Sequence, residues 1–429
     1  MSGDGATREA IEAVWRIESA RLIGGLVRML RDVGLAEDLA QEALVTALEH
    51  WPQTGIPDTP GAWLMATAKN RALDHLRRNS MLERKSAAIE EVTAPLPLHP
   101  LDIERAIDED VGDDLLRLIL VACHPVLSAE ARAALTLRLL GGLTTAEIAR
   151  AFLVPEATIA QRTVRAKRTL AEARVPFEVP RGADLAARLP SVLEVIYLIF
   201  NEGYAASHGD DWIRLELCED ALRLGRILAS LVSDEAEVHG LVALMELHAS
   251  RARARVGPSG EPILLLAQDR ARWDRLLMQR GLMALARAES LAQPLGPYTL
   301  QAAIAACHAR ARTGDDTDWK KILALYDALV EITRSPVVEL NRAVAVSMAF
   351  GPAAGLELVD ALMDEPLLRS YNLLPSVRGD LLMKLGRTAD ARNEFERAAF
   401  LAQNARERDL LLARAMVCGQ PENARRYRC

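Results

Sequence analysis

Acidic and amide side chains recur at helical spacing between Leu35 and Leu48, where together they could form a docking surface. Residues three and four positions apart lie on one face of a helix, so these side chains would share a face. Such a face suits a basic or amide-rich partner helix, although a solvated surface without a partner gives the same pattern. The candidate docking residues are Asp38, Gln41 and Glu42.

A second group of side chains, between Gly61 and Arg78, is basic and carries an amide and a carboxylate at regular intervals. A basic helix of this kind suits phosphate or single-stranded DNA, and an arginine-rich surface helix is the alternative interpretation. The helix is expected to bury Trp63, Leu64, Ala68, Leu73 and Leu76. The candidate nucleic-acid-binding residues are Lys69, Asn70, Arg71, Asp74, Arg77 and Arg78.

The segment from Thr144 to Leu170 has the pattern of two short helices joined by a tight turn. Thr144 and Glu147 have the spacing of a capping box, which marks the start of the first helix. Pro155 can open the second helix, because proline costs little at a first helical position. The face expected to pack inward holds Ile159, Thr163, Ala166 and Leu170. The opposite face holds Ala160, Gln161, Val164, Arg165 and Arg168.

This pattern predicts a helix-turn-helix whose outward face reads DNA. Arginine on such a face can contact guanine through two hydrogen bonds or pair with phosphate. Arg162 and Lys167 flank the face and are expected to touch phosphates, which give affinity without sequence preference. An ordinary helical hairpin with a solvated basic face is the alternative interpretation.

Two polar clusters in the second half of the chain are candidates for catalysis or ligand binding. One joins Asn201–Tyr204 with His208, Asp210 and Asp211, and the other spans Asp269–Asp274. Neither has nucleophile–base or metal-ligand spacing, so they are interpreted as a helix terminus and as ion pairs packed on Trp273. The five cysteines lie far apart, which argues against a zinc site or disulfide framework. We therefore expect no catalytic residue, metal or cofactor, and a protein that is not an enzyme.

Apolar residues recur at helical spacing almost throughout the 429 residues, which predicts an all-α protein of several domains. Prolines and charge divide it into residues 10–85, an acidic linker at 86–114, residues 115–175 and a long segment at 183–429. The net charge of −7 does not exclude nucleic acid, because the basic residues are clustered. No signal peptide is visible and no stretch approaches the roughly 20 apolar residues that span a bilayer, so a cytoplasmic protein is expected.

Residues 10–85 resemble region 2 of the extracytoplasmic-function (ECF) sigma factors of bacterial RNA polymerase. The resemblance implies that the candidate docking residues bind the clamp helices of the largest catalytic subunit of core polymerase. It also implies that the basic group melts and captures the −10 promoter element. The matching strings are Glu37-Asp38-Leu39-x-Gln41-Glu42 and Ala62-Trp63-Leu64-x3-Ala68-x-Asn70-x3-Asp74-x2-Arg77-Arg78.

Residues 124–173 are similar to region 4 of the same family. The similarity implies that this module reads the −35 element through Ala160, Gln161, Arg162, Val164, Arg165 and Arg168. Ala160 departs from the family pattern, because many relatives carry a longer polar residue there. The matching residues are Glu147-Ile148-Ala149, Val154-Pro155, Thr158-Ile159, Arg165-Ala166-Lys167 and Leu170. The linker is too short for a region 3 domain, and its acidic charge favours either contact with a basic channel or a solvated tether.

The last segment looks like a tetratricopeptide repeat around Leu385–Ala398, where small residues let two helices approach. Gly386, Ala391 and Ala398 are the small residues, and Phe395 is expected to fill the gap between the helices. The segment resembles the C-terminal extension of one ECF subgroup, which implies a regulatory domain. Helical repeats form surfaces for peptides or proteins, so a regulatory protein or peptide is the expected partner.

The resemblance implies an alternative sigma factor that binds core RNA polymerase and directs promoter-specific initiation. A helix-turn-helix activator with a repeat-type sensor domain is the alternative, but it leaves residues 38–42 and 63–78 unexplained. An enzyme or scaffold built on helical repeats leaves the whole N-terminal half unexplained.

Overall fold

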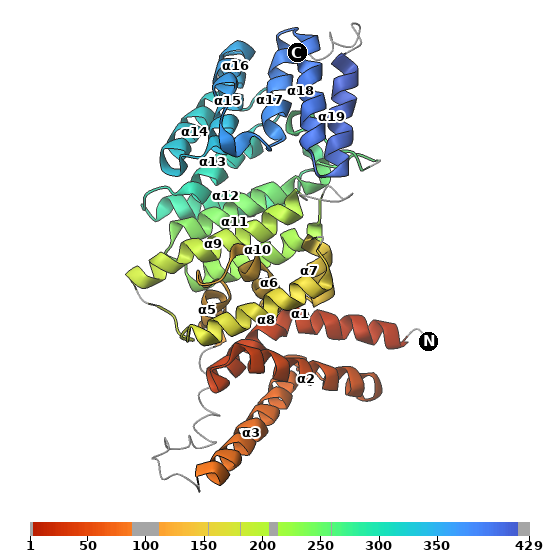
Figure 1. Ribbon diagram of the computed structural model, residues 1–429, viewed down its shortest axis with the longest axis vertical. Helices are drawn as coiled ribbons and strands as arrows, with labels where there is room; N and C mark the ends of the chain where they lie inside the picture. Colours follow the sequence, from red (N-terminus) through yellow and green to blue (C-terminus); the bar gives the residue numbers. More distant parts are fainter. Residues whose placement is uncertain are drawn as a thin grey trace. The chain divides into compact units, whose positions relative to one another are not determined.

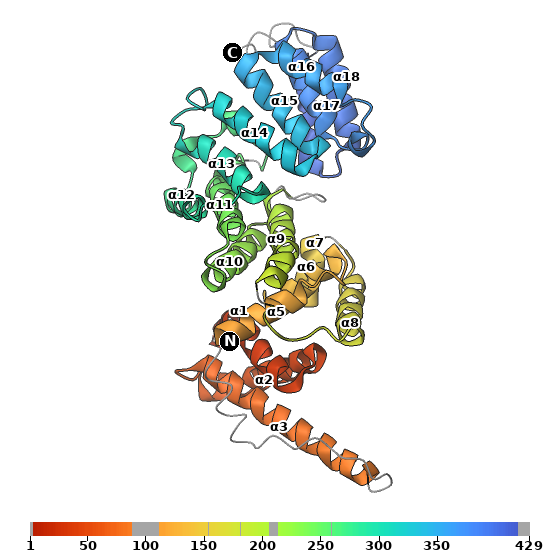
Figure 2. The same ribbon diagram turned by 90° about the vertical axis from the view of Figure 1, so that its left-hand side faces the viewer.

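The computed structural model describes residues 3–87, 111–152, 154–180, 182–205, 213–258 and 260–418. Within these ranges every regular element is a helix, apart from one isolated bridge between Val256 and Pro262 (Figures 1 and 2). The all-α prediction is therefore confirmed. The chain divides into two compact units, Met1–Ile196 and Tyr197–Cys429, and the division falls within helix α9 (Ala183–Tyr204).

The first three helices pack on one another, and their order follows the chain: α1 (Gly3–Leu30), α2 (Val33–Thr54) and α3 (Pro60–Ala87). Asp32 caps α2 by accepting a hydrogen bond from the backbone amide of Leu35 at 3.0 Å. The buried stripe of α2 consists mainly of small residues, which let the helices approach closely. Its members are Ala36, Glu37, Leu39, Ala40, Ala43, Ala47 and Trp51.

Helix α3 leaves the core toward its C-terminal end, as both views show (Figures 1 and 2). Leu64 and Ala68 are buried as expected, and Ala72 continues their stripe one turn later. Leu76 is 37% exposed, so its assignment to the core is wrong. The buried stripe ends before Leu76 because α1 and α2 do not extend along this part of α3.

The next helices of the first unit are α5 (Val111–Ala122), α6 (Ala129–Leu139), α7 (Thr145–Phe152) and α8 (Glu156–Glu172). Helix α5 begins inside the segment expected to be a linker, and Asp114 is buried rather than solvated. Its carboxylate pairs with Arg28 at 3.2 Å and with Arg117 at 2.7 Å. Most of the predicted acidic linker, residues 88–110, lies outside the described residues.

The first half of α9 belongs to the first unit and is held on its helix-turn-helix part. The hydroxyl of Ser191 donates to the backbone carbonyl of Cys123 at 2.6 Å. Arg132 pairs with Glu194 at 3.0 Å. The long C-terminal segment, expected from residue 183, therefore begins with a helix shared between the two units.

The second unit is built from consecutive helices that pack on their neighbours in the chain (Figure 1). They are α10 (Leu215–Leu231), α11 (Ala236–Ser250), α12 (Arg275–Ser290), α13 (Pro297–Arg310), α14 (Trp319–Thr333), α15 (Pro336–Phe350), α16 (Pro352–Ala361), α17 (Leu373–Lys384), α18 (Thr388–Leu401) and α19 (Ala405–Cys418). Short 3-10 helices lie at Ala252–Ala254, Leu265–Ala267, Arg270–Arg272 and Pro366–Leu368. The regular elements of this C-terminal domain in its described ranges are helices, as predicted, apart from the isolated bridge between Val256 and Pro262.

The hairpin of α17 and α18 depends on a close contact that differs from the expected one. Phe395 is fully buried between Ala391 and Ala398, as predicted. The glycine facing its ring is Gly379, where an added Cβ would lie 2.9 Å from the ring carbon Cε1. Gly386 instead forms the turn between the helices, with a φ of 79° that side chains rarely adopt.

None of the helices in the described ranges is both long and apolar enough to cross a membrane.

Replacing Gly379 with alanine should overpack this contact. We expect Gly379→Ala to lower the free energy of unfolding of the second unit by about 1–3 kcal/mol, measured by urea denaturation. Gly314→Ala is the matched control, because the nearest atom to an added Cβ there is 3.6 Å away. Equal stability of the two variants would contradict the assignment of Gly379 to a close approach.

Candidate nucleic-acid interface and partner surface

The paired helices α7 and α8 form the helix-turn-helix that the sequence predicts, with α6 packed against both. The capping box at the start of α7 is present: the Thr144 amide donates to the Glu147 carboxylate at 2.7 Å, and the Glu147 amide donates to the Thr144 hydroxyl at 3.2 Å. Pro155 stands one position before α8, as its N-cap residue. Local sequence signals therefore fix both helix starts.

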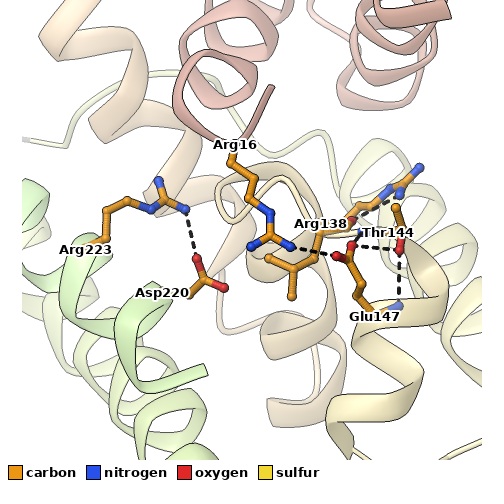
Figure 3. A network of polar contacts seen from close by, with 7 residues as sticks. Arg16, Arg138, Thr144, Glu147, Asp220 and Arg223 are labelled. Carbon is orange, nitrogen blue, oxygen red and sulfur yellow. Dashed lines mark hydrogen bonds and ion pairs between the residues drawn. The ribbon is translucent and has the colours of Figure 1, made fainter. Parts of the chain in front are cut away.

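The Glu147 carboxylate has a second role, because it also faces α1. Arg16 pairs with it at 2.7 Å, as Figure 3 shows beside the Thr144 contacts. Burial would raise the pKa of Glu147, but the Thr144 hydrogen bonds and the Arg16 charge lower it below its ordinary value. The carboxylate is therefore charged near neutral pH, and its ion pair with Arg16 joins the helix-turn-helix to α1.

The two faces of α8 are divided as predicted. The inward residues Ile159, Thr163, Ala166 and Leu170 are buried, which confirms the predicted packing face. The outward residues Ala160, Gln161, Val164, Arg165 and Arg168 are all exposed, and Arg162 is half-buried at their edge. Val164 is 65% exposed, so its apolar side chain is available on the outward face.

A buried carboxylate, Glu37, links α2 to the helix-turn-helix part. Glu37 is only 3% exposed, and Arg138 of α6 binds its Oε1 at 2.7 Å. Lys167 of α8 binds the other carboxylate oxygen. Lys167 is thus turned toward α2 in this structure and away from the face expected to meet DNA phosphates.

The candidate docking residues lie beside Glu37 on α2. Asp38 is 71% exposed in its side chain, with an oxygen 3.9 Å from the Lys167 ammonium. Gln41 is half-buried and donates to Glu37 at 2.5 Å. Glu42 is exposed and pairs with Arg71 of α3. The three predicted side chains are neighbours on α2, and the two charged ones, Asp38 and Glu42, are exposed to solvent.

The candidate nucleic-acid residues of α3 are arranged along its free part. Asn70, Asp74, Arg77 and Arg78 are exposed, whereas Lys69 and Arg71 are half-buried. Arg77 lies 3.4 Å from Asp74, and Arg78 donates to the Asp74 carbonyl at 3.3 Å. Arg71 also donates to the Thr46 hydroxyl at 2.8 Å. The structure thereby brings Arg71 and Glu42 together, although the sequence assigned them to different partners.

Sequence reasoning missed the role of Glu37, which it treated only as part of a matching string. One local signal was available, because Glu37 and Gln41 are four residues apart on one helix face. The cations that bury the carboxylate are far away in the chain, with Arg138 101 residues from Glu37. Their approach could not be read from helical periodicity.

Among the described residues, no group of three or more histidine, cysteine, aspartate or glutamate side chains is arranged to hold a metal ion. The cluster that the sequence places after Tyr204 includes His208, Asp210 and Asp211, which lie outside the described residues.

Three family models match this chain. "Sigma-70 region 2" matches residues 17–81, and "Sigma-70, region 4" matches residues 117–170. A third model, described as a family of unknown function (DUF6596), matches residues 188–289. The first two matches coincide with the α1–α3 hairpins and the helix-turn-helix, so they define the class as a sigma-70 type initiation factor.

Curated relatives refine this class. "Uncharacterized protein R00370" of Rhizobium meliloti is 44% identical over 386 residues, 90% of each chain. "ECF RNA polymerase sigma factor SigL" of Mycobacterium tuberculosis is 29% identical over 172 residues, 40% of this chain and 92% of the relative. "Probable ECF RNA polymerase sigma factor SigI" of that species is 29% identical over 183 residues, 40% of this chain and 58% of the relative. No solved structure matches the chain significantly.

The chain belongs to the ECF family of RNA polymerase sigma factors and carries a C-terminal DUF6596 domain. It is an alternative sigma factor that directs transcription initiation, and the family binds core RNA polymerase and promoter DNA.

Removing one partner of Glu37 should weaken the first unit. We expect Arg138→Met to lower its free energy of unfolding by about 1–3 kcal/mol, because a buried carboxylate loses a charged hydrogen bond. Urea denaturation followed by tryptophan fluorescence measures the change. Arg168→Met is the control, since the Arg168–Glu172 pair is exposed and should contribute about 0.3–0.5 kcal/mol. Equal losses in the two variants would argue against Glu37 as a structural link.

Proposed function

We propose that the exposed face of α8 reads the −35 element and the basic residues of α3 contact the −10 element. We propose further that Asp38, Gln41 and Glu42 bind core polymerase. The division of α8 into a buried and an exposed face carries this proposal. Residues that pack the helix and residues that remain available are separated, as a recognition helix requires.

The exposed face of α8 has the chemistry of direct readout. Gln161 can form paired hydrogen bonds to adenine, and Arg165 can do the same with guanine. Exposed Val164 supplies an apolar contact of the kind that recognises a thymine methyl group. Ala160 offers only its methyl group, so any specificity at this position rests on shape or an apolar contact. Arg168 and Arg162 flank these side chains and suit phosphates.

The docking surface on α2 supports a basic partner. Asp38 and Glu42 are one helical turn apart and both exposed. An acidic patch of this kind favours association with a positively charged helix and disfavours acidic surfaces. Arg71 already pairs with Glu42, so part of this surface is set by α3 rather than by α2 alone.

We propose that promoter binding separates the two modules. The −10 and −35 elements are different segments of the promoter, so each module has to reach its own stretch of DNA. In this structure the α2 and α8 helices are in direct contact through Glu37 and Lys167. We therefore propose that this arrangement belongs to the free factor and that the Glu37 contacts open when polymerase and promoter bind.

A helix-turn-helix activator remains a weaker interpretation, because it gives no role to α2 and α3. A non-catalytic initiation factor uses both. We propose that the C-terminal domain regulates this factor, with a protein or peptide as one class of partner.

Arg165→Ala should weaken binding to a cognate promoter by about 1–3 kcal/mol and relax selection at one −35 position. Reconstituted polymerase on promoters with altered −35 positions gives the measurement. Arg21→Ala removes the same charge from a partly exposed α1 side chain and should leave selectivity unchanged. Unaltered −35 selectivity in Arg165→Ala would exclude this residue from base recognition.

Asp38→Arg should lower the affinity for core polymerase by at least tenfold, which is about 1.4 kcal/mol, because it sets a positive charge against a basic partner. Co-purification and competition binding with core polymerase measure this loss. Glu49→Arg is the matched control, since it makes the same charge change at an exposed position farther along α2. Equal affinities of the two variants would contradict the docking surface.

A further inference from the structure

A cavity of about 280 Å³ lies inside the second unit, between α11, α13 and α14. Its walls combine polar and aromatic side chains from segments far apart in the sequence. They include Tyr197, His248, Arg251, Trp273, His308 and Tyr326. Leucine and isoleucine side chains of α11 and α13 complete the walls, so an apolar body would also find contacts.

Two hydrogen-bonding atoms in this wall lack a protein partner. Trp273 is only 5% exposed, and no group in the described ranges accepts a hydrogen bond from its indole Nε1. The ring nitrogen Nδ1 of His308 is buried and likewise has no partner among the described residues. Buried donors and acceptors are nearly always satisfied in proteins, so each of these two atoms is expected to meet a partner from outside the protein, such as a water molecule or a ligand.

The cavity has a positive charge and no acidic side chain in its wall. Arg251 is half-buried there, and among the described residues no carboxylate pairs with it. Burial, reinforced by the charges of Arg251 and Arg270, lowers the pKa of His308 to about 4. Burial and nearby arginines also lower the pKa of His248. Both imidazoles are therefore neutral, and the arginine supplies the charge.

The acidic side chains near Trp273 are engaged elsewhere, contrary to the expected ion-pair network. Asp274 caps α12 by accepting from the amides of Leu276 and Leu277 at 2.9 and 3.0 Å. Arg270 lies over the Trp273 ring at 4.9 Å. It also donates to the Ala311 carbonyl at 2.8 Å, so it is held in place without a carboxylate.

Aromatic and hydroxyl groups lie in the wall and behind it. Tyr204 is not part of the wall but stacks on His248 with ring centres 5.0 Å apart, and the Arg251 guanidinium lies 5.7 Å from the Tyr204 ring centre. Burial raises the pKa of Tyr197 and of Tyr326 to about 12, so both hydroxyls stay protonated and can donate. Side chains that carry hydrogen-bond donors, together with one guanidinium, therefore line a space with partly aromatic walls.

We propose that this cavity binds a small aromatic carboxylate. The carboxylate would pair with Arg251 and accept a hydrogen bond from Trp273 Nε1, while the ring would pack among the aromatic and aliphatic walls. A guanidinium is well suited to a carboxylate because its N–H groups match both oxygens. This goes beyond promoter recognition, because it gives the C-terminal domain a small-molecule ligand.

The test is calorimetric titration of the full-length chain with benzoate, phenylacetate, salicylate and indole-3-carboxylate, with benzamide and inorganic phosphate for comparison. We expect at least one carboxylate to bind saturably and at least tenfold more tightly than benzamide and phosphate. Absence of saturable binding by all four carboxylates would overturn the proposal. Binding of phosphate as tight as that of the best carboxylate would overturn the assignment of an aromatic body.

Variants locate the site. Arg251→Met should weaken binding of the best carboxylate at least tenfold, and Trp273→Phe should weaken it about threefold to tenfold by removing one donor. Arg253→Met is the matched control, because Arg253 is exposed two residues along the chain and should leave affinity unchanged. Unchanged affinity in Arg251→Met would overturn the proposal.

A second measurement does not depend on the stability of these variants. In chain labelled with 5-fluorotryptophan, Trp273→Phe identifies one ¹⁹F resonance, which the best carboxylate should shift at saturation in the otherwise unaltered chain. Absence of that shift would place the ligand elsewhere and overturn the site. Because neither assay contains polymerase or DNA, failure here leaves the proposed roles of α2, α3 and α8 unaffected.

Discussion

A carboxylate that is almost completely removed from water must be paired, and Glu37 is paired by cations from another module. Arg138 and Lys167 reach it from α6 and α8, so one acidic side chain holds the region 2 and region 4 helices together. Arg16–Glu147 joins the same two modules at a second point. Ion pairs of this type are directional, and each charged group can pair with another charge instead. They suit two modules that must meet in one state and part in another.

The second unit is organised differently. Its helices pack through small residues and a buried aromatic ring, as at Gly379 and Phe395, and such contacts cannot be exchanged for solvent without loss of stability. The cavity at Arg251 and Trp273 is an exception to this close packing. Trp273 Nε1 and His308 Nδ1 are buried without a protein partner among the described residues, and both side chains line this cavity, as polar groups of a binding site do.

Local signals made much of the first unit predictable. The capping box at Thr144 and the buried face of α8 follow from helical periodicity, because they involve residues at most a few turns apart. Leu76 was assigned wrongly because periodicity cannot tell where a neighbouring helix ends. The Glu37 contacts and the cavity were not predictable, because their members come from segments as much as 130 residues apart. Gly379 was missed for the same reason, since nothing in its own helix shows which ring it faces.

The Arg71–Glu42 pair connects the surface proposed for DNA with the surface proposed for polymerase. A phosphate that attracts Arg71 would release the Glu42 carboxylate, and a basic polymerase helix that attracts Glu42 would release Arg71. Thermodynamic linkage then requires each partner to change the affinity of the other by the same factor. A single ion pair would make promoter engagement and enzyme engagement cooperative, without any movement of the backbone.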